Sequence, residues 1–165
     1  MPMPEYFEDF EVGATQKFGE YRVTREEILE FAARYDPQPF HLSDEAAAKT
    51  LFGSLCASGW HTCAMLMSMI VENMQSGNPG GSPRGNPAAL GSPGIDEIRW
   101  TKPVYPGDTL RVESTILDKK PSRSRPEIGT IYMQNKVYNQ NDELVMSNKP
   151  MVMYRRRNPA GGGEP

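Results

Sequence analysis

The sequence has little of what several specialised classes of protein require. Its two cysteines, Cys56 and Cys63, lie seven positions apart on one expected helix start. They are thus about two turns apart and cannot easily form a disulfide, which predicts a reduced, cytoplasmic protein. The net charge is −3, so the chain lacks the basic excess of general nucleic-acid binding proteins, and we expect no nucleic-acid partner.

Long apolar runs are also missing. The N-terminus has neither the basic start nor the apolar core of a signal peptide. The longest apolar stretch, near residues 60–74, is too short to cross a bilayer. We therefore expect no membrane partner.

The composition is that of an ordinary soluble domain. The chain has 165 residues, of which 38% are hydrophobic and 24% charged. This length fits one domain with its own core, and we place it at residues 1–157. The glycine-rich end, residues 158–165, is expected to be disordered.

Three helices are predicted in the first half of the chain. Thr24 and Glu27 form the pattern of a capping box, and the helix that they begin should end near Tyr35, because Pro37 disfavours helical geometry at the residue before it. A short helix should follow Ser43 and end around residues 52–53. A third helix should run from residues 58–59 to about 75; it is apolar nearly all round, which predicts a buried helix.

The second half of the chain predicts strands. After a proline- and glycine-rich loop at 77–93, longer than average, strand-like segments occupy residues 95–101, 109–119, 129–139 and 143–155. Apolar residues alternate along them, so one face should pack on the third helix. Residues 5–23 are expected to be extended and turn-rich. These elements predict an α+β fold, in which a curved antiparallel sheet wraps one long buried helix.

Two short segments carry the chemistry that the sequence suggests. Residues 35–41 place Asp36 and His41 on one proline-stiffened loop, and residues 57–61 begin the third helix with Ser58 and Gly59. A carboxylate, an imidazole and a backbone donor at a helix N-terminus are the groups needed to move a proton beside a polarised carbonyl. Taken singly, an aspartate before a proline is usually a turn residue, and a single histidine is more often structural than catalytic.

Other chemistries find less support. Ser58 is read most simply as a helix cap, since it lacks the surroundings of a nucleophilic serine. His61 with Cys56 and Cys63 does not match common zinc spacings, and a fourth ligand is not evident. We therefore expect no metal.

These segments resemble the MaoC-like dehydratases, a family of the hot-dog fold related to R-specific enoyl-CoA hydratases. Residues 36–41 match the family's hydratase motif, with Gln38 where an asparagine is usual, followed by Pro39 and His41. Residues 57–60 match its helix start, and residues 99–108 match a strand followed by a Pro-Val-x-Pro-Gly-Asp turn. The resemblance extends from about residue 7 to residue 157, and loop 77–93 is longer than in typical members.

The resemblance implies reversible hydration of a 2-enoyl-CoA. Asp36 and His41 would form the acid–base pair that activates water, and the N–H of Gly59 would bind the thioester oxygen. Coenzyme A would be part of the substrate, with no other cofactor. Residues expected to shape the loop or line the substrate site are Gln38, Pro39, Phe40, Ser58 and Trp60.

A basic cluster at residues 119–125 has two interpretations. Its residues are either solvated turn residues or, for Arg123 and Arg125, ligands of the coenzyme A phosphates.

The resemblance also implies a homodimer or a dimer-based oligomer with its active sites near the interface. Two alternatives to a hydratase stay open. One is an acyl-CoA thioesterase of the same fold, and the other is a non-catalytic module that binds acyl thioesters.

Overall fold

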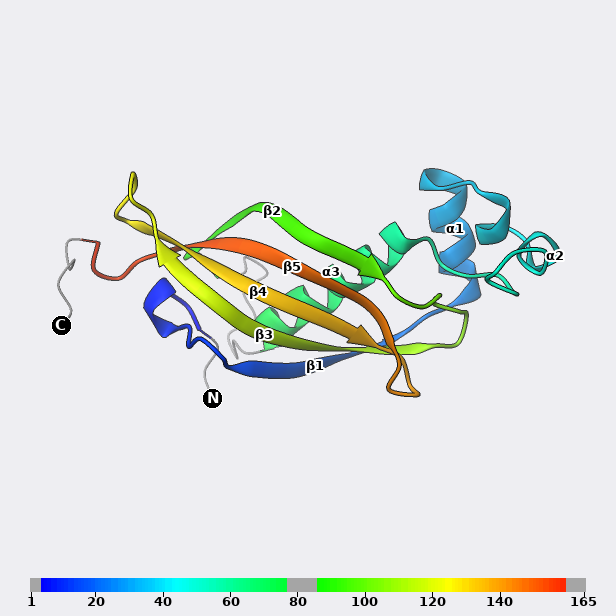
Figure 1. Ribbon diagram of the computed structural model, residues 1–165, viewed down its shortest axis with the longest axis horizontal. Helices are drawn as coiled ribbons and strands as arrows, with labels where there is room; N and C mark the ends of the chain where they lie inside the picture. Colours follow the sequence, from blue (N-terminus) through cyan, green and yellow to red (C-terminus); the bar gives the residue numbers. More distant parts are fainter. Residues whose placement is uncertain (1–3, 77–85, 160–165) are drawn as a thin grey trace.

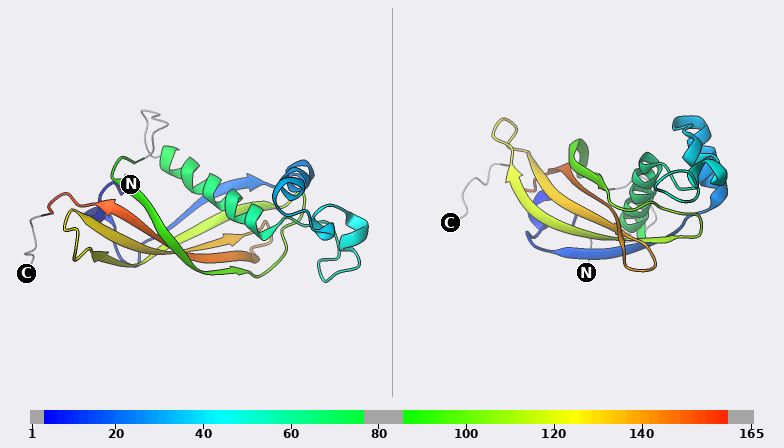
Figure 2. Two further views of the ribbon diagram at one scale, coloured as in Figure 1. Left: turned by 90° about the horizontal axis from the view of Figure 1, so that it is seen from above. Right: turned by 45° about the vertical axis from the view of Figure 1, so that its right-hand side comes forward.

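The computed structural model describes residues 4–76 and 86–159. Five strands form one antiparallel sheet in the order β1-β3-β4-β5-β2. Helix α3 lies along one face of the curved sheet, and helices α1 and α2 gather at one end of the molecule (Figures 1 and 2). This architecture confirms the expected α+β class.

Helix α1 (Arg25–Tyr35) has the boundaries that the sequence predicts. Thr24 is its N-cap, and the Thr24 hydroxyl accepts a hydrogen bond from the Glu27 N–H. Asp36 is the C-cap, and its N–H donates to the Ala32 carbonyl over 2.9 Å. The helix therefore ends at the residue that precedes Pro37, which leaves the Asp36 side chain at a fixed point beside the next loop.

The loop after α1 is folded tightly. Pro39–His41 forms a turn of 3-10 helix, η2, and α2 (Asp44–Ala47) follows behind the expected cap Ser43. Helix α2 is shorter than predicted: from Ala48 to Phe52 the chain continues as turns.

Helix α3 (Gly59–Ser76) also appears where predicted, but the sheet covers only one of its sides. The buried side carries Met65, Leu66 and Met69, which pack against the strand residues of the main core. On the opposite side, Met67 is 54% exposed and Val71 is 40% exposed in the single chain.

The long strands are β2 (Ala89–Trp100), β3 (Thr109–Pro121), β4 (Ile128–Tyr138) and β5 (Leu144–Arg155). The last three match the predicted segments closely. Strand β2 begins at Ala89, six residues before the predicted start, and includes residues 89–93 at the end of the expected loop. Residues 77–85 of that loop and residues 160–165 of the expected disordered tail lie outside the described residues.

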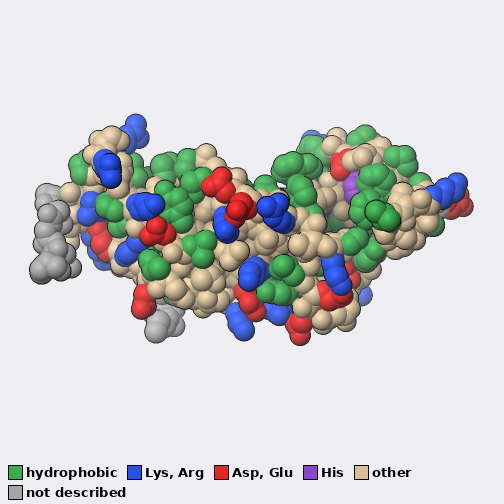
Figure 3. All heavy atoms as spheres, in the orientation of Figure 1, with side chains coloured by type: hydrophobic (Ala, Val, Ile, Leu, Met, Phe, Trp, Pro, Cys, Tyr) green, Lys and Arg blue, Asp and Glu red, His purple; other side chains and the backbone are tan. Residues whose placement is uncertain are grey.

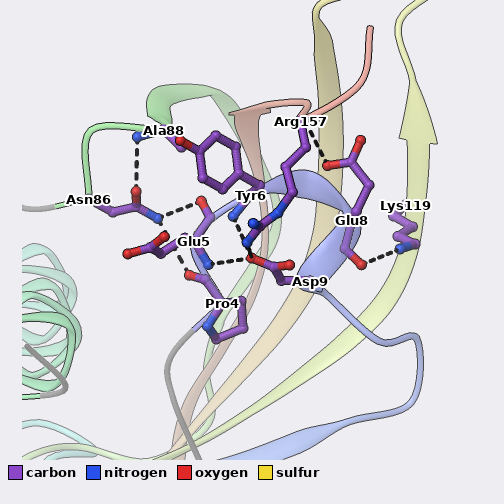
Figure 4. Close-up of polar contacts among 9 residues, drawn as sticks. All are labelled: Pro4, Glu5, Tyr6, Glu8, Asp9, Asn86, Ala88, Lys119 and Arg157. Carbon is purple, nitrogen blue, oxygen red and sulfur yellow. Dashed lines mark hydrogen bonds and ion pairs between the residues drawn. The ribbon is translucent and has the colours of Figure 1, made fainter. Parts of the chain in front are cut away.

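The N-terminal segment adds a further strand and an anchor at the end of the sheet away from α1. Strand β1 (Thr15–Arg22) pairs with β3, within a region that the sequence indicated only as extended. A preceding 3-10 turn, η1 (Phe7–Asp9), is fastened by a 2.7 Å hydrogen bond from Arg157 to Asp9 (Figure 4). This bond brings the two ends of the described chain together, and in the same view the Asn86 amide donates to the Glu5 carbonyl over 2.8 Å.

Along the described parts of the chain, we find no helix that is both long enough and apolar enough to cross a membrane.

The packing of η1 predicts a glycine requirement in β4. A Cβ on Gly129 would lie 2.2 Å from the Phe7 ring, whereas a Cβ on Gly94 in β2 would meet only the flexible end of Met151 at 3.3 Å. Gly129→Ala should therefore destabilise the protein by about 1–3 kcal/mol through overpacking, and Gly94→Ala should cost much less. Urea unfolding of both variants measures the difference, and equal losses would contradict the role of the Phe7 contact.

Candidate active site

The structure brings Asp36, His41 and Ser58 together at the end of the molecule formed by α1 and α2. Asp36 Oδ2 lies 3.4 Å from His41 Nε2 and accepts a 2.7 Å hydrogen bond from the Ser58 hydroxyl. The other carboxylate oxygen, Oδ1, accepts a 2.6 Å bond from the Gln38 amide. Three of the predicted site residues, Asp36, Gln38 and Ser58, are thus joined by hydrogen bonds, and a fourth, His41, lies beside them.

The backbone orients the His41 ring. Its Nδ1 lies 2.8 Å from the Cys56 carbonyl oxygen. A carbonyl only accepts hydrogen bonds, so Nδ1 must carry the proton. In the neutral ring, Nε2 then presents its lone pair toward the Asp36 carboxylate. Two acceptors therefore face each other over 3.4 Å, a geometry that suits a molecule able to donate a hydrogen bond to each.

Aromatic side chains enclose the imidazole. The Phe40 ring meets the His41 ring edge-on with centroids 4.5 Å apart, and Phe52 packs on Phe40 at 5.0 Å. The His41 side chain is only 7% exposed, while that of Asp36 is 17% exposed. Pro39 is the first residue of the η2 turn, where its fixed φ is tolerated, and His41 is the buried residue of this turn.

Asp36 is held in its charged form. Burial raises the pKa of this carboxyl, but hydrogen bonds from Gln38 and Ser58, together with the nearby His41 ring, outweigh burial and leave the pKa below its ordinary value. Asp36 is therefore a carboxylate at neutral pH. The Gln38 side chain, one methylene longer than asparagine, reaches the Asp36 carboxylate with its amide.

Helix α3 begins beside this group. The first four N–H groups of a helix have no partner within it, and the helix dipole makes this end positive. Gly59 is the first residue of α3 and directly follows Ser58, so its N–H belongs to this end of the helix. The Pro-Val-Tyr-Pro-Gly-Asp turn holds the segment that leads into α3, because the Ala57 N–H donates to the Val104 carbonyl over 2.8 Å.

Two tryptophans lie at the N-terminal end of α3. Trp60 is 60% exposed and meets the Trp100 ring edge-on at 5.3 Å. Trp100 also donates from its indole Nε1 to the Gly59 carbonyl over 2.8 Å. Two groups that contact the candidate site were not predicted from the sequence: the Cys56 carbonyl, which contacts His41, and the Trp100 side chain, which contacts Gly59. The only sequence signal for Trp100 was its position at the end of a strand, shortly before the Lys-Pro-Val turn.

The structure does not bring every predicted residue to this group. Arg123 and Arg125 lie in the hairpin between β3 and β4, at the end of the sheet opposite α1 and α2 (Figure 1). In a single copy of the chain they are therefore remote from Asp36. At the α1 and α2 end, a histidine side chain with an acidic side chain beside it lies among hydrophobic side chains (Figure 3).

The second histidine has a different environment. The His61 ring stacks flat on Phe31 of α1, with centroids 4.6 Å apart and planes 4° from parallel. Its Nε2 lies 3.7 Å from Glu27 Oε1, and its Nδ1 is buried without a hydrogen-bond partner among the described residues. Burial lowers the pKa of His61 to about 4, despite the neighbouring carboxylate. His61 thus joins α1 to α3 as a neutral ring.

None of these side chains forms a metal site: across residues 4–76 and 86–159, histidine, cysteine, aspartate and glutamate nowhere gather in the groups of three that could hold an ion.

Comparisons with known proteins agree with this geometry. Residues 9–138 match the MaoC like domain. The chain belongs to the MaoC-like dehydratase family. A MaoC-like dehydratase from Rhodospirillum rubrum has the same fold, with a TM-score of 0.78 and 39% identity, over 92% of this chain and 97% of that one. The hot-dog fold implied by the resemblance is thereby confirmed.

Two curated proteins are similar in sequence to this chain over nearly its whole length. The uncharacterized protein YdeM of Bacillus subtilis is 28% identical and covers 90% of this chain and 98% of its own. A 3-hydroxybutyryl-CoA dehydratase of Methylorubrum extorquens is 26% identical over 94% of this chain and 87% of its own. The family and the Methylorubrum relative both point to a hydratase or dehydratase, whereas the Bacillus relative has no assigned activity.

The buried His61 predicts a pH dependence of stability. The folded state keeps His61 neutral down to about pH 4, whereas an unfolded histidine takes up its proton near pH 6.5. Stability is thus complete above pH 6.5 and falls as the pH falls toward 4, by about 3 kcal/mol for this group. His61→Phe keeps a ring on Phe31 and removes the titration. Urea unfolding of both proteins at several pH values should show a flatter profile for the variant; parallel profiles would refute the assignment.

Proposed function

We propose that the protein hydrates the double bond of 2-enoyl-CoA thioesters reversibly, with Asp36 and His41 as the acid–base pair. The proposal rests on one observation: two hydrogen-bond acceptors, Asp36 Oδ2 and His41 Nε2, face each other at a distance of 3.4 Å. A water molecule has two O–H groups and can donate one to each, so its oxygen lone pair is left pointing outward toward a substrate.

The reaction then follows from this arrangement. The water oxygen forms a bond to C3 of the enoyl group while one of its protons passes to the Asp36–His41 pair. The electrons of the double bond move toward the thioester carbonyl, whose oxygen becomes negative. The Gly59 N–H, at the positive end of α3, stabilises that oxygen. The pair then returns the proton to C2, so water has been added and the protein regains its starting state.

The supporting residues have positional roles. Ser58 and Gln38 each donate to Asp36, which keeps the carboxylate charged and fixes its direction. The Cys56 carbonyl holds the proton of His41 on Nδ1 and leaves Nε2 free to accept. Phe40 packs on His41, and Trp60, Pro39 and Phe40 are proposed to border the acyl group. A phosphate contact by Arg123 or Arg125 would require a second copy of the chain.

Absorbance and thiol measurements separate this reaction from its alternatives. We expect crotonyl-CoA and longer 2-enoyl-CoAs to lose their enoyl absorbance without release of free thiol. Thiol release would instead identify a thioesterase. Binding with neither change would identify a non-catalytic module for acyl thioesters.

Substitutions test the two roles directly. Asp36→Asn and His41→Ala should each lower kcat by about 10²–10⁴, the range of a general acid–base group, with the fold retained. Asp118→Asn, which changes an exposed carboxylate of β3, is the matched control and should keep the wild-type rate. Full activity in both site variants would overturn the assignment.

We also propose that two copies of the chain pair along β2 and α3. Strand β2 is an edge of the sheet, with a partner strand on only one side. Helix α3 meets the end of β2 at Trp100. Trp60, Met67 and Val71 lie on one face of this helix and are all exposed, as is Ile95 on the strand. An open sheet edge together with an exposed apolar helix face suits a self-complementary partner that continues the sheet.

The size of the protein in solution tests this pairing. Light scattering should give a dimer or a multiple of it, and Met67→Lys should shift the population toward the monomer because it places a charge in the apolar stripe. Glu72→Lys, a charge change further along the same helix, serves as a comparison. A wild-type monomer at all concentrations would contradict the pairing.

Two free thiols, Cys56 and Cys63, together with a coenzyme A substrate, fit the cytoplasmic location expected from the sequence.

A further inference from the structure

The Trp100 side chain contacts the first residue of α3 in two ways. Its indole Nε1 donates to the Gly59 carbonyl over 2.8 Å. The ring also covers the Gly59 Cα so closely that an added Cβ would lie 2.5 Å from Trp100 Cε2 and 2.7 Å from Nε1. Gly59 is therefore a glycine because the indole occupies the space of any side chain.

The indole itself is held from the sheet. Trp100 is the last residue of β2 and pairs with Met146, a fully buried residue of β5. The next residue, Thr101, donates its N–H to the Val145 carbonyl over 2.9 Å. Trp60 adds an edge-on ring contact from the helix side. The ring thus has a fixed backbone on one side and the start of α3 on the other, although it is 44% exposed.

The Ser58–Gly59 peptide is consequently fixed from both directions. On one side, the Ser58 hydroxyl is bonded to the Asp36 carboxylate over 2.7 Å. On the other, the indole contacts the Gly59 Cα and carbonyl. The N–H between these two anchors is the donor proposed to bind the thioester oxygen. A donor contributes most when its direction is set before the negative charge develops.

We propose that Trp100 is a positioning residue, which aims the Gly59 N–H relative to the Asp36–His41 pair through its hydrogen bond and ring contact. This inference rests on the hydratase function proposed above. Trp100 acts through Gly59 and not on the reacting atoms, so its loss should lower kcat more than it changes KM.

Graded substitutions of Trp100 test the positioning. Trp100→Phe keeps a ring against Gly59 but removes the Nε1–H donor, and it should lower kcat by about 10-fold. Trp100→Ala removes both contacts and should lower kcat by about 100-fold, with KM little changed. Leu117→Ala removes an exposed apolar side chain of β3 and should match the wild type. A rise in KM at unchanged kcat in the Trp100 variants would overturn the proposal.

A double-mutant cycle with Gly59 tests the contact itself. Gly59→Ala should lower kcat by about 100-fold or more, because the new methyl group collides with the indole. If the collision is the cause, Gly59→Ala/Trp100→Ala should be no slower than Trp100→Ala alone. Multiplied losses, about 10⁴-fold in the double variant, would show two independent effects and contradict the inference.

Unfolding measurements separate failure of this inference from failure of the proposed function. The same four proteins are compared by thermal unfolding and light scattering, neither of which needs a substrate. An inactive wild type in which Gly59→Ala is destabilising only beside Trp100 would refute the hydratase function while supporting the contact. An active wild type with additive losses in both rate and stability would refute the positioning role alone.

Discussion

The hydrogen bond from Ser58 to Asp36 is the interaction on which the site depends. It joins two parts of the chain that are 22 positions apart, the C-terminal end of α1 and the N-terminal end of α3, over 2.7 Å. Together with the hydrogen bond from the Gln38 amide, it lowers the pKa of the Asp36 carboxyl below its ordinary value. The His41 ring reaches the same segment through the Cys56 carbonyl over 2.8 Å, so the carboxylate, the imidazole and the helix N-terminus are held together.

Each partner in this bond is fixed by ordinary local structure. Pro37 ends α1 at Asp36, and the turn at residues 103–108 holds Ala57 through the Val104 carbonyl. His61 stacks on Phe31 and so ties the first turn of α3 to the body of α1. Both histidines of the chain are buried, but His61 packs between α1 and α3, whereas His41 lies beside the Asp36 carboxylate.

Much of the fold was predictable, because its signals are local. The caps Thr24 and Ser43, the end of α1 before Pro37 and the alternation along β3 depend on residues close together in the chain. The predicted bounds of secondary structure were incomplete where pairing between distant strands determines them. Strand β1 exists because β3 offers it a partner, and β2 starts early because β5 is long enough to pair with residues that look like loop. Helix α2 ends early because the chain must turn toward Leu55, whose N–H donates to Asp44.

The sequence by itself determined the chemical groups: Asp36, Gln38 and His41 are close together along the chain, and Ser58 and Gly59 open a helix, so motif and spacing suffice to name them. Only the tertiary structure decided how these groups are arranged. The proton of His41 lies on Nδ1 because the Cys56 carbonyl is 2.8 Å away, Gly59 has no room for a side chain because Trp100 covers it, and Arg123 and Arg125 are remote because the β3–β4 hairpin points to the opposite end. The physical reason is that hydrogen-bond direction and close packing are properties of atoms brought together by folding, which spacing along the chain does not specify.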